Sequence, residues 1–144
     1  MSTLITNTIQ SATSSPPVMK NSSGTEIGQF AKAWVNFDGT SGGTNKTIRS
    51  SFNISTVTDN GLGDYTINFT NAMPNANYVV CGNGGLGMIT GTYNAWTSVY
   101  IHAQGGSPFR QDPTTTSFRI AMSRMGDAAY VQDYERVSLV VFGE

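Results

Sequence analysis

The residues that could support catalysis are few and widely separated. His102 is the only histidine, so a Ser-His-Asp triad would have to be built on it. It lies in a short alternating run beside Tyr100, which favours a structural or surface role. A single histidine could also bind a metal on a threefold axis, with one ligand from each of three chains. Neither arrangement is favoured by the surrounding residues, and we expect no catalytic residue and no metal.

Aspartates offer a second possible chemistry, because two carboxylates can hydrolyse a glycosidic bond. The candidates are Asp59, Asp64, Asp127 and Asp133. Asp59 and Asp64 flank the turn at residues 60–63, where aspartate favours the backbone geometry by itself. The same segment lacks the spacing and the terminal glutamate of an EF-hand loop. These aspartates therefore indicate a turn, and we expect neither enzyme activity nor a bound cofactor.

Cys81 and the glycines that follow it are the remaining chemical candidates. Cys81 is the only cysteine, which excludes an internal disulfide. It lies in the apolar run 78–82, so we expect an inert thiol in the core. The glycine-rich residues 82–87 do not lead into a helix, so they are weak candidates for a phosphate-binding loop. Both features are interpreted as structural.

Aromatic residues between the predicted strands are better candidates for binding. They are Tyr93, Trp96, Phe109, Tyr130 and Tyr134. Exposed rings can stack on sugars or anchor a protein interface, whereas buried rings would close the ends of the fold, and both interpretations stay open. Loops between rigid strands often carry recognition. The expected partner- or receptor-binding residues are Tyr93, Asn94, Trp96, Phe109 and Arg110, with Trp96 as the main anchor.

Alternating patterns predict the scaffold on which these residues depend. In residues 64–70, Tyr65, Ile67 and Phe69 point to one side and polar residues point to the other. Residues 48–54 also alternate, and an Asn-Gly turn lies between the two runs. We therefore predict that residues 48–54 and 64–70 form a central β-hairpin.

Further short strands are predicted throughout the second part of the chain. They cover residues 31–37, 78–82, 98–103, 116–122 and 136–142, and no segment keeps a helical apolar period for ten residues. Regularly spaced short strands predict an all-β fold, a single antiparallel β-sandwich of jelly-roll-like type. The expected core residues are Val35, Phe37, Phe52, Ile67, Phe69, Val80, Ile120 and Val141.

The first 30 residues have a different composition. They are rich in Ser, Thr and Asn, contain Pro16-Pro17, and have no aromatic residue before Phe30. We therefore divide the chain into an extended N-terminal arm, residues 1–30, and a sandwich domain, residues 31–144. Such an arm orders only against a partner. The expected anchoring residues are Leu4, Ile5, Ile9, Val18 and Ile27.

Composition limits the possible partners. Only 12% of the 144 residues are charged, and 8 Lys and Arg oppose 9 Asp and Glu, so we expect no nucleic-acid partner. No apolar run approaches the roughly 20 residues of a membrane span, so we expect no membrane insertion. The first residues lack the pattern of a signal peptide, which predicts a protein made in a cytoplasm. Weakly charged sheet edges favour burial in a symmetric oligomer.

Several segments, in order and at consistent spacing, resemble a module of tail-fibre and related virion proteins of tailed phages, especially phages of marine bacteria and cyanobacteria. The segments are residues 33–40, 48–54, 58–69 and 72–78, preceded by a connector-like run at 20–28 and followed by a closing strand at 137–142. The segment 83–113 lies outside this similarity.

The resemblance implies a structural virion protein, commonly a homotrimer that contacts other virion proteins. The first expectation is a tail-fibre or tail-associated protein, attached through its arm and contributing to host attachment. The alternatives are a capsid decoration or adaptor protein with a purely structural role, and a receptor-recognition module that binds a host surface glycan. In each case we expect the protein in the virion, on the tail or on the head.

Overall fold

The computed structural model describes residues 19–85, 97–101, 111–124 and 131–143, and for residues 97–101, 123 and 124 it describes the backbone only. The chain divides into two compact units, Met1–Phe30 and Ala31–Glu144.

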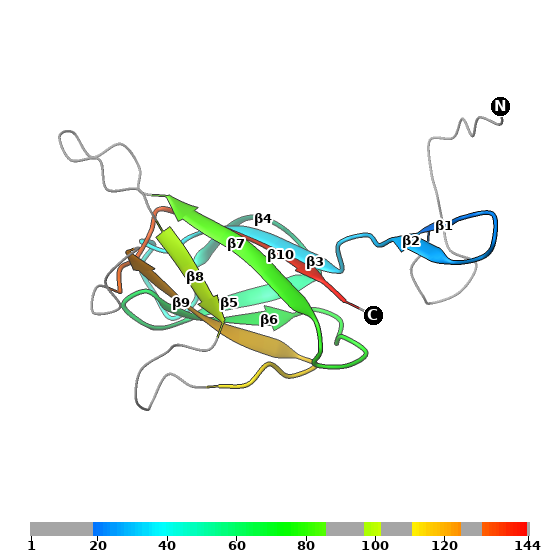
Figure 1. The fold of residues 1–144 in the computed structure, drawn as a ribbon. Helices are drawn as coiled ribbons and strands as arrows, with labels where there is room; N and C mark the ends of the chain where they lie inside the picture. The colour runs from blue at the N-terminus through cyan, green and yellow to red at the C-terminus, as the bar shows by residue number, and fades with distance from the viewer. Residues whose placement is uncertain (1–18, 86–96, 102–110, 125–130, 144) are drawn as a thin grey trace. The chain divides into compact units, whose positions relative to one another are not determined.

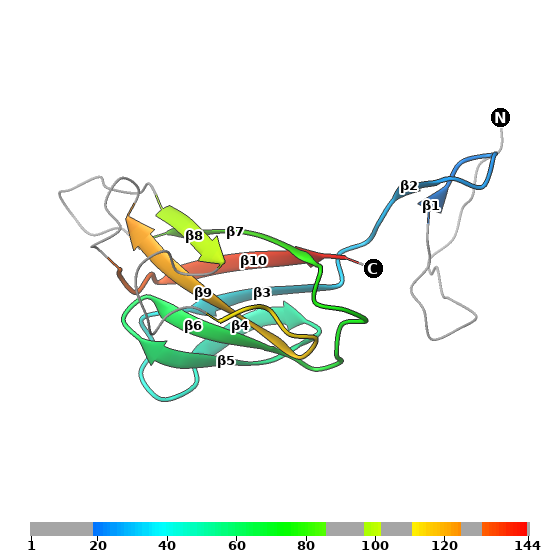
Figure 2. The same cartoon turned by 60° about the horizontal axis from the view of Figure 1, so that its bottom comes forward.

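In the described part of the second unit, eight antiparallel strands form two four-stranded sheets (Figures 1 and 2). Their order in the sheets is β4-β3-β10-β7 and β5-β6-β9-β8. The strands are β3 (Ala33–Asp38), β4 (Thr47–Phe52), β5 (Ile54–Gly61), β6 (Asp64–Phe69), β7 (Val79–Gly85), β8 (Thr97–Ile101), β9 (Ser117–Arg124) and β10 (Arg136–Phe142). The predicted antiparallel β-sandwich is confirmed.

The core lies between the two sheets and follows the predicted alternation. Ala33, Val35 and Phe37 point inward from β3, and Tyr65, Ile67 and Phe69 point inward from β6. An aromatic edge-to-face contact joins the sheets, between Phe37 on β3 and Tyr65 on β6 at a centroid distance of 5.1 Å. The predicted core residues found buried are Val35, Phe37, Ile67, Phe69, Ile120 and Val141. Val80 is only partly buried, because it lies on the edge strand β7.

The prediction that residues 48–54 pair with β6 in a central hairpin was wrong. β5, Ile54–Gly61, pairs with β6, whereas residues 47–52 form β4 and pair with β3 in the other sheet. The chain changes sheets at Asn53, which has a φ of 56° and whose side-chain amide donates to the carbonyls of Lys32 and Asn71. Phe52 precedes this change and is 54% exposed rather than buried. An alternating pattern does not reveal a change of sheet, since the apolar period continues through it.

The described part of the first unit is a small antiparallel ribbon of β1 (Met19–Lys20) and β2 (Glu26–Gly28). Asn21 builds its turn, because the side-chain oxygen accepts from the amides of Ser23 and Thr25 at 3.1 and 2.9 Å. Within residues 19–28 of the predicted arm, the two short strands therefore pair with each other. Ile27 is 67% exposed, and the other expected anchors, Leu4, Ile5, Ile9 and Val18, lie outside the described residues.

Candidate interaction surface

The outer face of the β4-β3-β10-β7 sheet, formed by side chains that point away from the core, carries an apolar row across all four strands. In the strand register, Val140 lies opposite Trp34 on one side and Cys81 on the other, and Trp34 lies opposite Phe52. Phe142 and Val79 form the next pair on the same face. These six residues are called the apolar patch: Trp34, Phe52, Val79, Cys81, Val140 and Phe142.

A neutral polar row lies beside the apolar patch, followed by a charged end. Ser138 lies opposite Asn36 and Asn83, and Asn36 lies opposite Ser50. The Asn36 amide donates to the Ser138 hydroxyl at 2.8 Å. One register step further, Asp38 on β3 and Arg136 on β10 share the face. The outer face therefore changes along its strands from apolar to neutral polar to charged.

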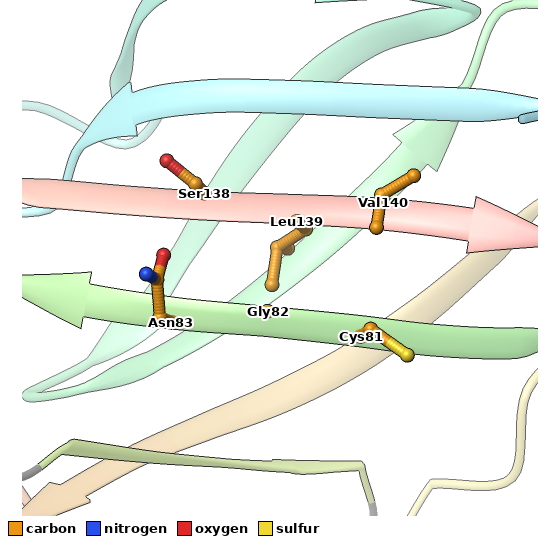
Figure 3. Close-up of a pocket in the computed structure, with 6 residues that line it drawn as sticks. All are labelled: Cys81, Gly82, Asn83, Ser138, Leu139 and Val140. Carbon is orange, nitrogen blue, oxygen red and sulfur yellow. The ribbon is translucent and has the colours of Figure 1, made fainter.

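A shallow hollow of about 320 Å³ lies over β7 and β10 on this sheet (Figure 3). Figure 3 shows Cys81 beside Val140 and Asn83 beside Ser138. The remaining lining residues are Gly82 and Leu139. A Cβ on Gly82 would lie 2.4 Å from Leu139 Cδ2, so glycine lets Leu139 pack closely against β7. The hollow is open and has few converging polar groups, which suits a contact surface better than an enclosed small-molecule site.

On the opposite outer face, the described side chains of β5, β6 and β9 are mostly polar and bonded to one another. The Asn68 amide donates to the hydroxyls of Thr56 and Thr58 at 3.0 and 3.2 Å. The Asn60 amide donates to the Thr66 hydroxyl at 2.8 Å, and Arg119 binds Asp64. Side chains satisfied in this way suit a face that meets water. The described parts of the two outer faces therefore differ, and exposed apolar patches are typical of interaction surfaces.

The ionisable side chains form ion pairs that join neighbouring segments. Lys46 and Asp59 lie 2.7 Å apart, and this bond to Lys46 is the main reason that the pKa of Asp59 is lowered. Arg49 and Asp38 lie 2.9 Å apart. The pKa of Asp38 is lowered first by the Thr40 hydroxyl and less by the Arg49 charge. The carboxylates of Asp38 and Asp59 therefore stabilise the fold through bonds to side chains of the same chain.

Tyr65 and Asp133 form a buried connection between β6 and the segment before β10. The Tyr65 hydroxyl donates to Asp133 Oδ1 at 2.5 Å, and the Gly63 amide donates to the same oxygen at 2.8 Å. Burial, followed by the Asp133 hydrogen bond and charge, raises the pKa of Tyr65 above its usual range. Of the four aspartates considered for glycoside hydrolysis, Asp59, Asp64 and Asp133 thus have structural partners, and Asp127 lies outside the described residues.

All five binding residues expected from the sequence lie outside the described residues. They are Tyr93, Asn94, Trp96, Phe109 and Arg110, and the same holds for His102 and Tyr130. Tyr134 is described and is fully buried in the core, so this ring closes the sandwich. The core position expected for Cys81 was wrong. Its side chain points outward from the edge strand β7 and is exposed, although its neighbours in sequence are apolar.

The sequence prediction missed the apolar patch, but a signal for it was present. Trp34 lies out of phase with the core residues Ala33 and Val35. The run 137–142 is apolar at every position except Ser138, whereas a strand with one wet face alternates. Near-continuous apolar strands indicate that both faces are covered. On β3 and β10, the described part of the chain does not cover the outer face, because Trp34 and Phe142 are each 38% exposed.

Comparisons of the chain with protein families, with curated proteins and with solved structures find no match. The described residues contain no apolar helix of the length needed to cross a bilayer. Within the same ranges, no three His, Cys, Asp or Glu side chains gather closely enough to hold a metal ion. The fold and the surface together define an all-β sandwich with an apolar patch on the outer face of one sheet.

Proposed function

We propose that this protein is a structural component of a tailed-phage virion, most simply a tail-fibre or tail-associated protein that contributes to host attachment. The observation that carries the proposal is the apolar patch. It spans four strands of one sheet, while the described side chains on the opposite outer face are mostly polar and bonded to one another. A rigid sandwich with one apolar face is suited to burial against other proteins of a particle.

The segments that carry the resemblance to virion proteins support the same proposal. Residues 33–40 include β3, residues 58–69 include the β5–β6 turn and β6, and residues 137–142 lie in β10. These strands provide inward-facing core residues, so the similarity concerns the scaffold of the domain. In the proposal, the scaffold presents the apolar patch, and the N-terminal unit attaches the protein to its neighbours. The resemblance implies a homotrimer as the assembled form.

A host surface glycan is the second candidate partner, because an aromatic ring and amide groups share the outer face. Trp34 is exposed, and Asn36 lies two residues further along the same face of β3. Rings stack on sugars, and amides bond their hydroxyl groups. A decoration or adaptor protein with a purely structural role would use the apolar patch for packing and would bind no glycan.

Immunoelectron microscopy of the phage particle, with antibodies against the purified chain, tests the proposal. Labelling at the tail supports a tail-associated protein, whereas labelling at the head supports a decoration protein. Particles without label would contradict a virion role. Excess purified chain, added to host cells before the phage, should reduce adsorption if the protein binds a receptor, and the Trp34→Ala variant should then reduce it less.

A further inference from the structure

The apolar patch is comparable in size to the largest apolar patch of a typical monomer. Trp34 and Phe142 are each 38% exposed, and Phe52 is 54% exposed. With about 200–250 Å² for a whole aromatic side chain, the three rings expose roughly 280 Å². Val79, Cys81 and Val140 extend the patch to about 400 Å², within the range in which the largest patch of a monomer is often functional.

The charges on the outer face restrict what can cover it. The apolar patch and the polar row contain no charged side chain, so a strongly charged partner would find no counter-charge there. Charge appears at the end of the face, where Arg49 on β4 already pairs with Asp38 on β3 at 2.9 Å and Arg136 lies on β10. Asp38 and Arg136 have opposite sign and lie on the two central strands of the sheet.

This arrangement is self-complementary. A twofold axis that runs parallel to the strands, between β3 and β10, would place each row of one copy over the same row of another. Trp34 would then lie over Val140, and Phe52 would lie over Cys81. At the charged end, Asp38 of each copy, which its own Arg49 already binds, would face Arg136 of the other, so the twofold brings opposite charges together at two places. Strands aligned in this way match the common class of face-to-face sheet packing.

We propose that the outer face of the β4-β3-β10-β7 sheet binds the same face of a second copy of this chain. The apolar patch and the polar row together offer about 600 Å² per copy, near the lower limit of specific interfaces. The pair is therefore weak, with a dissociation constant on the order of micromolar. In this inference the protein that covers the apolar patch is a second copy of the chain, and the pairing does not depend on the particle to which the protein belongs.

Sedimentation equilibrium of the full chain, from about 1 to about 200 µM, tests the pairing across the range expected for a weak interface. The mass should rise toward that of a dimer. Trp34→Asp places a charge in the apolar patch and should weaken association at least tenfold. Leu62→Asp is the matched control, because Leu62 is 60% exposed in the β5–β6 turn and lies outside the outer face. Circular dichroism checks that both variants fold.

Cross-linking tests the register independently of any loss of association. In the pair, the partner's Cys81 lies over Phe52, so Phe52→Cys should be joined to it by a short bismaleimide. The two Cys81 residues of a pair lie about 14 Å apart across the strands and about 10 Å apart between the sheets, so the wild-type chain should not react in this way. Leu62→Cys, with Cys81 retained, should also remain uncross-linked.

A chain that stays monomeric at every concentration overturns the pairing. A dimer or trimer whose mass is unchanged in Trp34→Asp also overturns it. A Phe52→Cys variant that cross-links no better than the Leu62→Cys control overturns it as well. A trimer of that kind would agree with the homotrimer implied by the resemblance. None of these results concerns the location of the protein in the virion, which the labelling experiment decides separately.

Discussion

The buried bond between Tyr65 and Asp133 predicts how the stability of the sandwich depends on pH. Tyr65→Phe removes the hydroxyl that donates to Asp133 Oδ1 and keeps the ring in the core. A hydrogen bond to a charged group contributes about 1.5–3 kcal/mol. We therefore expect Tyr65→Phe to lower the free energy of unfolding at pH 7 by roughly 2 kcal/mol.

The difference should disappear in alkali. The pKa of Tyr65 is raised in the folded protein, and an unfolded tyrosine has a pKa of about 10. Below pH 10 both states keep the phenol proton, so the contribution of Tyr65 is constant. Above pH 10 only the unfolded state loses it, and the wild-type free energy of unfolding falls by about 1.4 kcal/mol per pH unit. The advantage over Tyr65→Phe should therefore vanish near pH 11.5.

Urea unfolding, followed by circular dichroism between pH 7 and pH 11.5, measures both effects. Tyr78→Phe is the matched control, because its hydroxyl donates to the neutral carbonyls of Thr114 and Ser117 and its burial raises its pKa to about 12. Its loss at pH 7 should be smaller, about 1 kcal/mol, with a similar alkaline trend. If the difference between wild type and Tyr65→Phe stays the same from pH 9 to pH 11.5, then the folded protein does not hold Tyr65 neutral.

Two further perturbations test the local geometry. Gly63→Ala should cost more than about 2 kcal/mol, because Gly63 has a φ of 65° and a Cβ would lie 2.7 Å from the Gln132 amide nitrogen. Gly42→Ala, with open space around it, should change stability by less than about 0.5 kcal/mol in the same urea titration, and equal effects would contradict the contact argument. Lys46→Met should return the pKa of Asp59 toward its unfolded value, so the wild-type advantage should shrink as the pH falls below about 4. Unfolding curves measured from pH 7 to low pH should converge, and parallel curves would contradict this role of Lys46.

Local alternation was enough to predict the strands and the inward residues of the sandwich. Tyr65, Ile67 and Phe69 share one side of β6 because side chains alternate along any strand, whatever it pairs with. The same holds for Ala33, Val35 and Phe37 on β3. Composition likewise predicts a surface with little charge before any contact is known.

Which strands pair, and therefore which side chains meet on a face, was decided by the tertiary structure. The alternating run 48–54 continues through Asn53, yet its residues lie in different sheets, and Phe52 points outward as a result. Trp34 and Val140 are 106 positions apart in sequence but lie opposite each other, because β10 pairs with β3. The apolar patch exists only through this pairing: periodicity describes one strand at a time, whereas a surface is made by the register between strands.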